Sequence, residues 1–190
     1  MSIITKNSIY KIFFITVLSF VIILESKAND REIELNQLFK ELKTDNTSIS
    51  YKVEQKIWEI WSTHPTNKKL TSILAKGSSL VKNNQLNKAI EVFSEVINQD
   101  PNWAEAWNKR ATVFYMIGEY QKSQKDIDKV LKLEKRHFGA LSGQGLVQIK
   151  LENFEKALRS YEQVEQIYPS MISPKIMIPQ IKEMIKNQSV

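Results

Sequence analysis

The chain has 190 residues, a formal net charge of +6, 42% hydrophobic residues and no cysteine. This length allows one domain with a substantial core, and the lack of cysteine excludes a disulfide scaffold and any cysteine-ligated metal. With only 5 Gly and 5 Pro, the composition argues against a collagen-like or turn-rich all-β chain and favours a helical protein. Because the positive charge is mild, we expect no nucleic-acid partner.

Residues 1–28 have the pattern of an export signal. Lysines precede an apolar stretch over 12–24, and a small-x-small sequence ends at Ala28. The apolar stretch is shorter than the roughly 20 residues of a comfortable spanning helix. We therefore expect a cleaved signal peptide and a periplasmic mature chain. The alternative is a retained anchor in the inner membrane, which would be the chain's one membrane contact.

Residues 29–69 carry two amphipathic patterns that predict a helical pair. Apolar residues recur at helical spacing from Ile33 to Leu42, and again from Val53 to Trp61. We expect this pair to cap the N-terminal end of the domain that follows.

A period of 34 residues organises the next part of the chain. Three abutting units, 70–103, 104–137 and 138–171, agree place by place without a gap. The eighth place holds Gly77, Ala111 and Gly145, the twentieth Ala89, Ser123 and Ala157, and the twenty-fourth Phe93, Ile127 and Tyr161. Small residues at the first two of these places let two antiparallel helices approach, and large residues at the third fill the space beside them.

This pattern resembles the tetratricopeptide repeat, a helix-turn-helix unit. The middle unit has Trp107, Ala111, Phe114, Gly118 and Tyr120 where that family has aromatic, small, aromatic, turn glycine and aromatic residues. The resemblance implies an all-α fold, a solenoid of three tetratricopeptide units with flanking capping helices.

A second resemblance covers nearly the whole mature chain. The segment Ile57-Trp58-x-x-Trp61 and the stretches 104–108 and 136–141 look like those of exported tetratricopeptide proteins of alphaproteobacteria. This resemblance implies an exported scaffold without enzymatic activity and leaves the partner open.

Residues 172–190 predict a last, capping helix. Ser173-Pro174 reads as an N-cap followed by proline at the first helical position, and an apolar stripe runs from Ile176 to Ile185. Pro179 is expected to bend this helix or delay its start.

The sequence contains no motif that predicts catalysis, a cofactor or a metal site. His64 and His137 have no metal-ligand spacing, and we expect each to favour the negative, C-terminal end of a helix. Asp126 and Asp128 have lysines at i±3 and i±4, which predicts a solvated charged face and no acid–base pair. The chain is therefore not expected to be an enzyme.

Gly139, Gly143 and Gly145 form a small cluster that could be mistaken for a phosphate loop. A phosphate loop requires a preceding strand, whereas these glycines fall within the first predicted helix of the third unit. We expect Gly145 to be the small packing residue of that unit, and Gly139 and Gly143 to leave room on the groove side.

The predicted binding site is the concave surface that the first helix of each unit lines. The repeat positions that line this groove in the tetratricopeptide family correspond here to the candidate residues Leu74, Ser78, Val81, Asn108, Thr112, Tyr115, Met116, Ser142, Leu146 and Ile149. The middle of this set is apolar and adaptable, which predicts binding of an apolar or amphipathic segment of another envelope protein. The alternative is a self-associating accessory protein whose last helix fills the groove.

Some tetratricopeptide proteins bind the C-terminal carboxylate of a chaperone through Lys, Asn and Arg side chains. The corresponding places of this chain hold Leu74, Ser78, Lys109, Gly139 and Gly143. Because Lys109 is the one suitable donor left, the sequence does not predict a carboxylate clamp.

Overall fold

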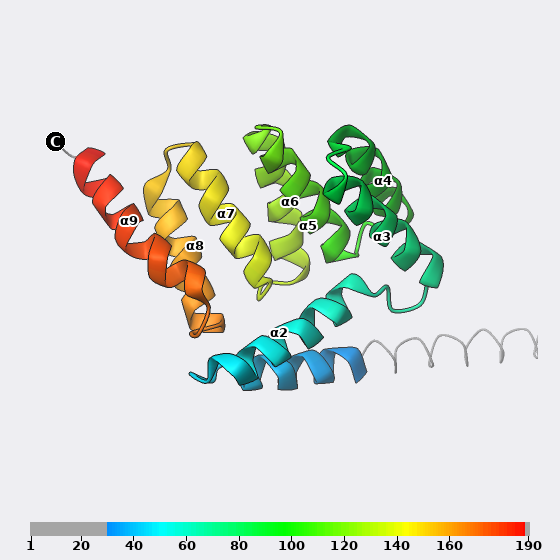
Figure 1. Cartoon of the computed structure of the whole chain (residues 1–190), viewed down its shortest axis with the longest axis horizontal. Helices are drawn as coiled ribbons and strands as arrows, with labels where there is room; N and C mark the ends of the chain where they lie inside the picture. Colours follow the sequence, from blue (N-terminus) through cyan, green and yellow to red (C-terminus); the bar gives the residue numbers. More distant parts are fainter. Residues whose placement is uncertain (1–29, 189–190) are drawn as a thin grey trace, which may run out of the picture.

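The computed structural model describes residues 30–188, and over that range every regular element is a helix. A first helix over 30–41 is followed by α2 (Thr47–Ser62), α3 (Lys68–Lys82), α4 (Leu86–Gln99), α5 (Ala104–Met116), α6 (Tyr120–Leu133), α7 (Phe138–Lys150), α8 (Phe154–Ile167) and α9 (Ile172–Gln188). From α3 onward, successive helices pack side by side as antiparallel neighbours (Figure 1). This arrangement confirms the predicted all-α solenoid. The expected signal peptide lies outside the described residues.

The turn inside each helical pair has the same backbone conformation. Asn84, Gly118 and Glu152 have φ values of 55°, 81° and 59°, and they stand 34 residues apart. A left-handed residue at this place turns the chain back sharply enough for the second helix to pack on the first. Glycine adopts this conformation freely and asparagine tolerates it, whereas a glutamate there is strained.

Glycine allows the close contact inside two of the helical pairs. A Cβ atom at Gly77 would lie 2.4 Å from Cε1 of Phe93, and one at Gly145 would lie 2.4 Å from Cε2 of Tyr161. In the middle pair, Ala111 is the small residue, and the hydroxyl of Ser123 donates to its carbonyl oxygen at 2.8 Å. The aromatic rings therefore occupy the space that a side chain would otherwise take, as the sequence predicted for Gly145.

The helix α9 continues the stack at the C-terminal end. Ile181 is fully buried against Ala157 and Tyr161 of α8. Pro179 lies inside α9 and does not delay its start, because the helix already begins at Ile172.

The N-terminal helical pair does not stack on the first repeat as a simple end cap would. Instead α2 begins near the end of α8 and runs across the ends of the repeat helices toward α3 (Figure 1). Leu42, Ile57 and Trp61 share a buried cluster with Phe138 and Tyr168. This placement differs from the predicted one because the apolar faces of the pair find their partners in the last repeat.

Polar contacts fix the same arrangement. The hydroxyl of Tyr168 donates to the Glu54 carboxylate at 3.0 Å, and that of Ser170 donates to Ser50 at 2.7 Å. These bonds join residues more than 100 positions apart in the chain, so the pair closes the repeats into one unit.

Two glycines of α7 should respond oppositely to alanine. Gly145→Ala places a methyl group against the ring of Tyr161, so we expect it to lower the free energy of unfolding by about 1–3 kcal/mol. Gly143→Ala meets nothing closer than Cδ1 of Ile127 at 3.7 Å, so we expect it to raise that free energy by roughly 0.5–1 kcal/mol through helix propensity. Urea unfolding of the two variants measures both effects. A stabilising Gly145→Ala would show that the helices are less tightly apposed than described.

Candidate functional site

The ten predicted groove residues lie on the first helices α3, α5 and α7, but they differ in exposure. Thr112, Met116 and Leu146 are exposed; Ser78, Val81, Tyr115, Ser142 and Ile149 are half-buried; Leu74 and Asn108 are buried. The surface that a partner can reach is therefore concentrated on the C-terminal halves of α5 and α7.

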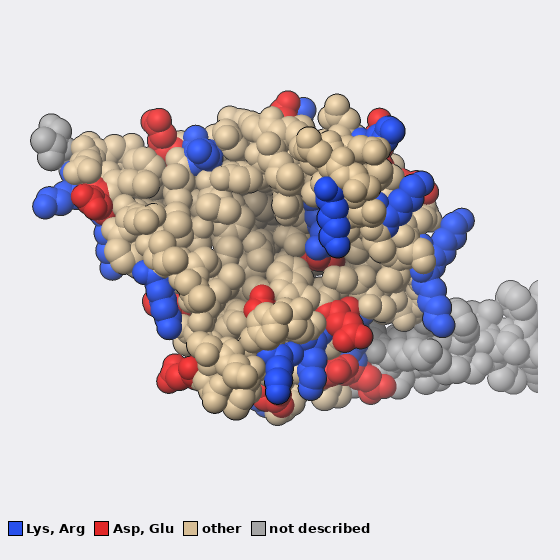
Figure 2. All heavy atoms as spheres, viewed as in Figure 1, with Lys and Arg blue, Asp and Glu red and all other residues tan. Residues whose placement is uncertain are grey.

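A cavity of about 200 Å³ lies at the centre of this surface, between α5 and α7. We call it the central cavity; its lining residues are Asn108, Ala111, Thr112, Tyr115, Ser123, Ile127, Gly139, Ala140, Ser142, Gly143 and Leu146. None of these is Lys, Arg, His, Asp or Glu. Figure 2 shows the hollow between α7 and α5 as an uncharged area, with charged side chains around its margin. Five of the ten predicted residues meet here: Asn108, Thr112, Tyr115, Ser142 and Leu146.

Of the five predicted residues outside the lining, Met116 is exposed at the end of α5 and the other four have contacts elsewhere. Leu74 and Val81 pack in the core of the first repeat, and the hydroxyl of Ser78 donates to the Leu74 carbonyl. Ile149 packs in the cluster that α9 forms with α8. The last helix thus contacts one predicted groove residue and contributes none to the lining of the central cavity.

Two tryptophans of α2 close one end of the groove, which the sequence did not predict. A Cβ atom at Gly139 would lie 2.6 Å from Cη2 of Trp58, so this glycine makes room for the indole ring. Trp61 stacks on His137 with ring centroids 4.0 Å apart and planes 8° apart. The room expected at Gly139 is therefore taken by the chain itself, at the N-terminal ends of α5 and α7.

A buried polar cluster lies beneath these tryptophans. The Nδ1 atom of His137 accepts from the Ala140 amide, so its Nε2 atom carries the proton and donates to Glu105 at 3.1 Å. The Glu105 carboxylate also accepts from Asn108 at 2.9 Å and pairs with Lys109 at 3.0 Å. Every charged group here has a partner, which is what burial of a carboxylate requires.

The expected role of His137 is wrong. His137 is the N-cap of α7 and accepts a backbone N–H there, so it stands at the positive end of a helix. His64 lies in the connection between α2 and α3, where its Nδ1 accepts from the amides of Thr66 and Asn67 while its Nε2 donates to Asp100 at 2.8 Å. Each ring thus accepts backbone N–H groups at Nδ1 and bonds through Nε2 to a carboxylate distant in sequence.

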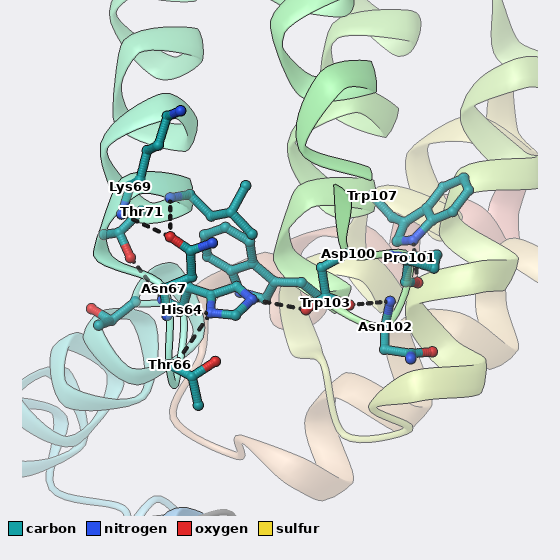
Figure 3. A network of polar contacts seen from close by, with 12 residues as sticks. His64, Thr66, Asn67, Lys69, Thr71, Asp100, Pro101, Asn102, Trp103 and Trp107 are labelled. Carbon is teal, nitrogen blue, oxygen red and sulfur yellow. Dashed lines mark hydrogen bonds and ion pairs between the residues drawn. The ribbon is translucent and has the colours of Figure 1, made fainter. Parts of the chain in front are cut away.

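The His64 contacts join the α2–α3 connection to the loop between α4 and α5 (Figure 3). The other oxygen of Asp100 accepts from the Asn102 amide at 2.9 Å, and the indole N–H of Trp103 donates to the Trp61 carbonyl at 2.8 Å. This junction fixes where α2 leaves the repeats and hence where its tryptophans lie.

The prediction that Asp126 belongs to a solvated face is also wrong. Asp126 is buried and accepts two bonds from the Arg110 guanidinium, at 2.7 and 2.9 Å. Arg110 also donates to Ser94 at 2.9 Å, so one arginine of α5 links α4 to α6. Asp128 is exposed, as expected.

Neither a metal-binding cluster nor a membrane-crossing helix is found in residues 30–188. No three His, Asp or Glu side chains of that part gather so as to hold a metal ion. None of its helices combines the length and the apolar character that a membrane span needs.

Comparison with known proteins identifies the repeats. A TPR repeat model matches residues 77–118, and a tetratricopeptide repeat model matches residues 140–170. The chain is a tetratricopeptide-repeat protein. A TPR repeat-containing protein of Rhizobium etli is 42% identical over 82 residues, which are 43% of this chain and 40% of that protein. This tetratricopeptide-repeat chain spans less than half the length of the curated relatives it first matches.

Solved tetratricopeptide domains share the fold at low sequence identity. The first TPR of Spaghetti (RPAP3), in a structure with the HSP90 peptide SRMEEVD, is 19% identical with a TM-score of 0.61, covering 63% of this chain and 94% of that one. MamA is 19% identical with a TM-score of 0.59, covering 84% of each chain. At this identity the likeness establishes the architecture of the repeats.

Glu105 should make the stability of the protein depend on pH. Burial alone would raise the pKa of Glu105, but the hydrogen bond from His137 and the charge of Lys109 together hold this pKa below its ordinary value of 4.5. A lowered folded-state pKa stabilises the folded chain above pH 4.5, and this contribution is lost as the pH falls through the folded value. We expect Glu105→Gln to lower the free energy of unfolding by about 1.5–3 kcal/mol at pH 7. We also expect this free energy to fall less steeply in the variant as the solution is acidified.

Urea unfolding between pH 7 and pH 3 tests this expectation. Glu91→Gln, on the exposed face of α4, is the matched control and should follow the unaltered protein. If the free energy of unfolding of Glu105→Gln falls as steeply toward pH 3 as that of the unaltered protein, other carboxylates cause the pH dependence.

Proposed function

We propose that this protein is a non-enzymatic interaction scaffold that binds an apolar or amphipathic segment of another protein between α5 and α7. The observation that supports the proposal is the uncharged central cavity, which the exposed Leu146 lines; the exposed Met116 directly follows the lining residue Tyr115 in α5. Concave surfaces of stacked helical repeats are binding surfaces, and methionine-rich apolar patches adapt to varied partners. The first TPR of RPAP3, which is bound to an HSP90 peptide, supports a peptide-binding role for such repeats in general.

We infer that the bound segment differs from the acidic SRMEEVD peptide of that relative. The one lysine at a clamp place, Lys109, pairs with Glu105 at 3.0 Å and lies over the Trp58 ring at 5.6 Å. A peptide carboxylate would have to displace one of these contacts. The apolar character of the central cavity instead favours recognition by burial of hydrophobic side chains.

Self-association is the second candidate function, and one observation favours it. Ile172 and Ile176, near the start of α9, are 69% and 51% exposed. The tryptophans of α2, Trp58 and Trp61, are instead packed against Phe138 and His137. Sedimentation over a concentration series separates the two functions, because a monomer at all concentrations excludes the second.

Export to the cell envelope is also a proposal, and it rests on the sequence of residues 1–28. We expect the N-terminal residue of the mature protein to be Asn29 and the protein to fractionate with the periplasm. N-terminal sequencing of the protein purified from its cells measures this. A chain that still begins at Met1 in the membrane fraction would favour the anchor, and one in the cytosol would contradict export.

A charge placed beside the central cavity should abolish partner binding. Met116 is 49% exposed, so Met116→Glu leaves the fold intact but puts a carboxylate where an apolar segment would have to desolvate it. We expect the adduct formed in cells by a photocrosslinking residue at Tyr115 to disappear in this variant. Leu133→Glu, at a residue of α6 that is 41% exposed, is the matched control and should keep the adduct. If the adduct persists in Met116→Glu, the groove assignment is wrong.

A further inference from the structure

Four of the five glycines have a structural reason in the described chain, and Gly143 has none. Gly77 and Gly145 face aromatic rings, Gly139 faces Trp58, and Gly118 has a positive φ. A Cβ atom at Gly143 would make one ordinary contact, 3.7 Å from Cδ1 of Ile127. A glycine inside a helix is less stable than an alanine, so the fold itself favours a side chain at this position.

The missing side chain leaves space in the central cavity, which Gly143 lines on the α7 side. The cavity measures about 200 Å³, and an apolar cavity of roughly 150 Å³ in another protein is large enough to hold benzene. An aromatic side chain therefore fits. A charged side chain does not, because no Lys, Arg, His, Asp or Glu lines the cavity to compensate for its lost hydration.

We propose that the central cavity is the anchor site for one large aromatic side chain of the partner segment, and that Gly143 determines this specificity. The inference rests on the proposed function and names the chemistry of the segment. One aromatic anchor in a desolvated pocket is the arrangement that commonly supplies most of the affinity of an interface.

A library of random linear peptides displayed on phage provides the probe. The protein is purified from its cells in detergent-free buffer, or in lipid nanodiscs if residues 1–28 are retained, so that no detergent competes for the cavity. Selected peptides are resynthesised with a fluorescent label. We expect them to share one aromatic residue. Gly143→Leu fills the cavity and should weaken their binding by about tenfold or more, while Gly143→Ala should weaken it less. Urea unfolding confirms that each variant is folded.

Ala75→Leu is the matched control. Ala75 is exposed on α3 at the place in the first repeat that Gly143 has in the third, and it lines a different depression. This variant should bind the peptides as the unaltered protein does. Peptides that bind Gly143→Leu as tightly as the unaltered protein would overturn the anchor site and leave the peptide groove standing. If the unaltered protein selects no peptide at all, the proposed function fails, and the anchor site fails with it.

Discussion

The close approach of the two helices within a repeat is the constraint on which the rest of the structure depends. At Gly77 and Gly145 the facing aromatic ring lies where a Cβ atom would be, so the helices pack at a distance that no larger residue permits. Because the two helices of a pair are in close contact, the turn between them is short and contains a left-handed residue. The first helices α3, α5 and α7 then lie next to one another along the stack. The groove exists because the pairs are compact.

The N-terminal helical pair then decides how much of that groove is open. Its tryptophans cover the N-terminal ends of α5 and α7, and the buried Glu105 carboxylate with its His137 partner lies beneath them. A buried ion pair seldom adds net stability compared with apolar packing, but removing one partner leaves a costly charge. The cluster therefore specifies one position of α2 more than it strengthens the fold.

The repeats could be predicted from the sequence because their determinants recur at a fixed spacing. Small residues eight places into each unit, and Gly118 at the turn, are readable without knowing the fold. The position of α2 could not be predicted, since amphipathicity identifies Ile57 and Trp61 as buried but not the Phe138 they bury against. Asp126 was misassigned for the same reason: its lysine neighbours are local, whereas its partner Arg110 comes from another helix.

The same distinction applies to the binding site. The groove positions taken from the family bring five of the ten predicted residues to the central cavity, but they do not predict its charge or depth. Those properties depend on the residues at these positions. Gly139 and Gly143 stand where a carboxylate clamp has cations, and Lys109 already pairs with Glu105. Because no Lys or Arg lines the cavity, a terminal carboxylate buried there would have no counter-charge. Geometry and electrostatics thus agree in selecting an apolar segment over a terminal carboxylate.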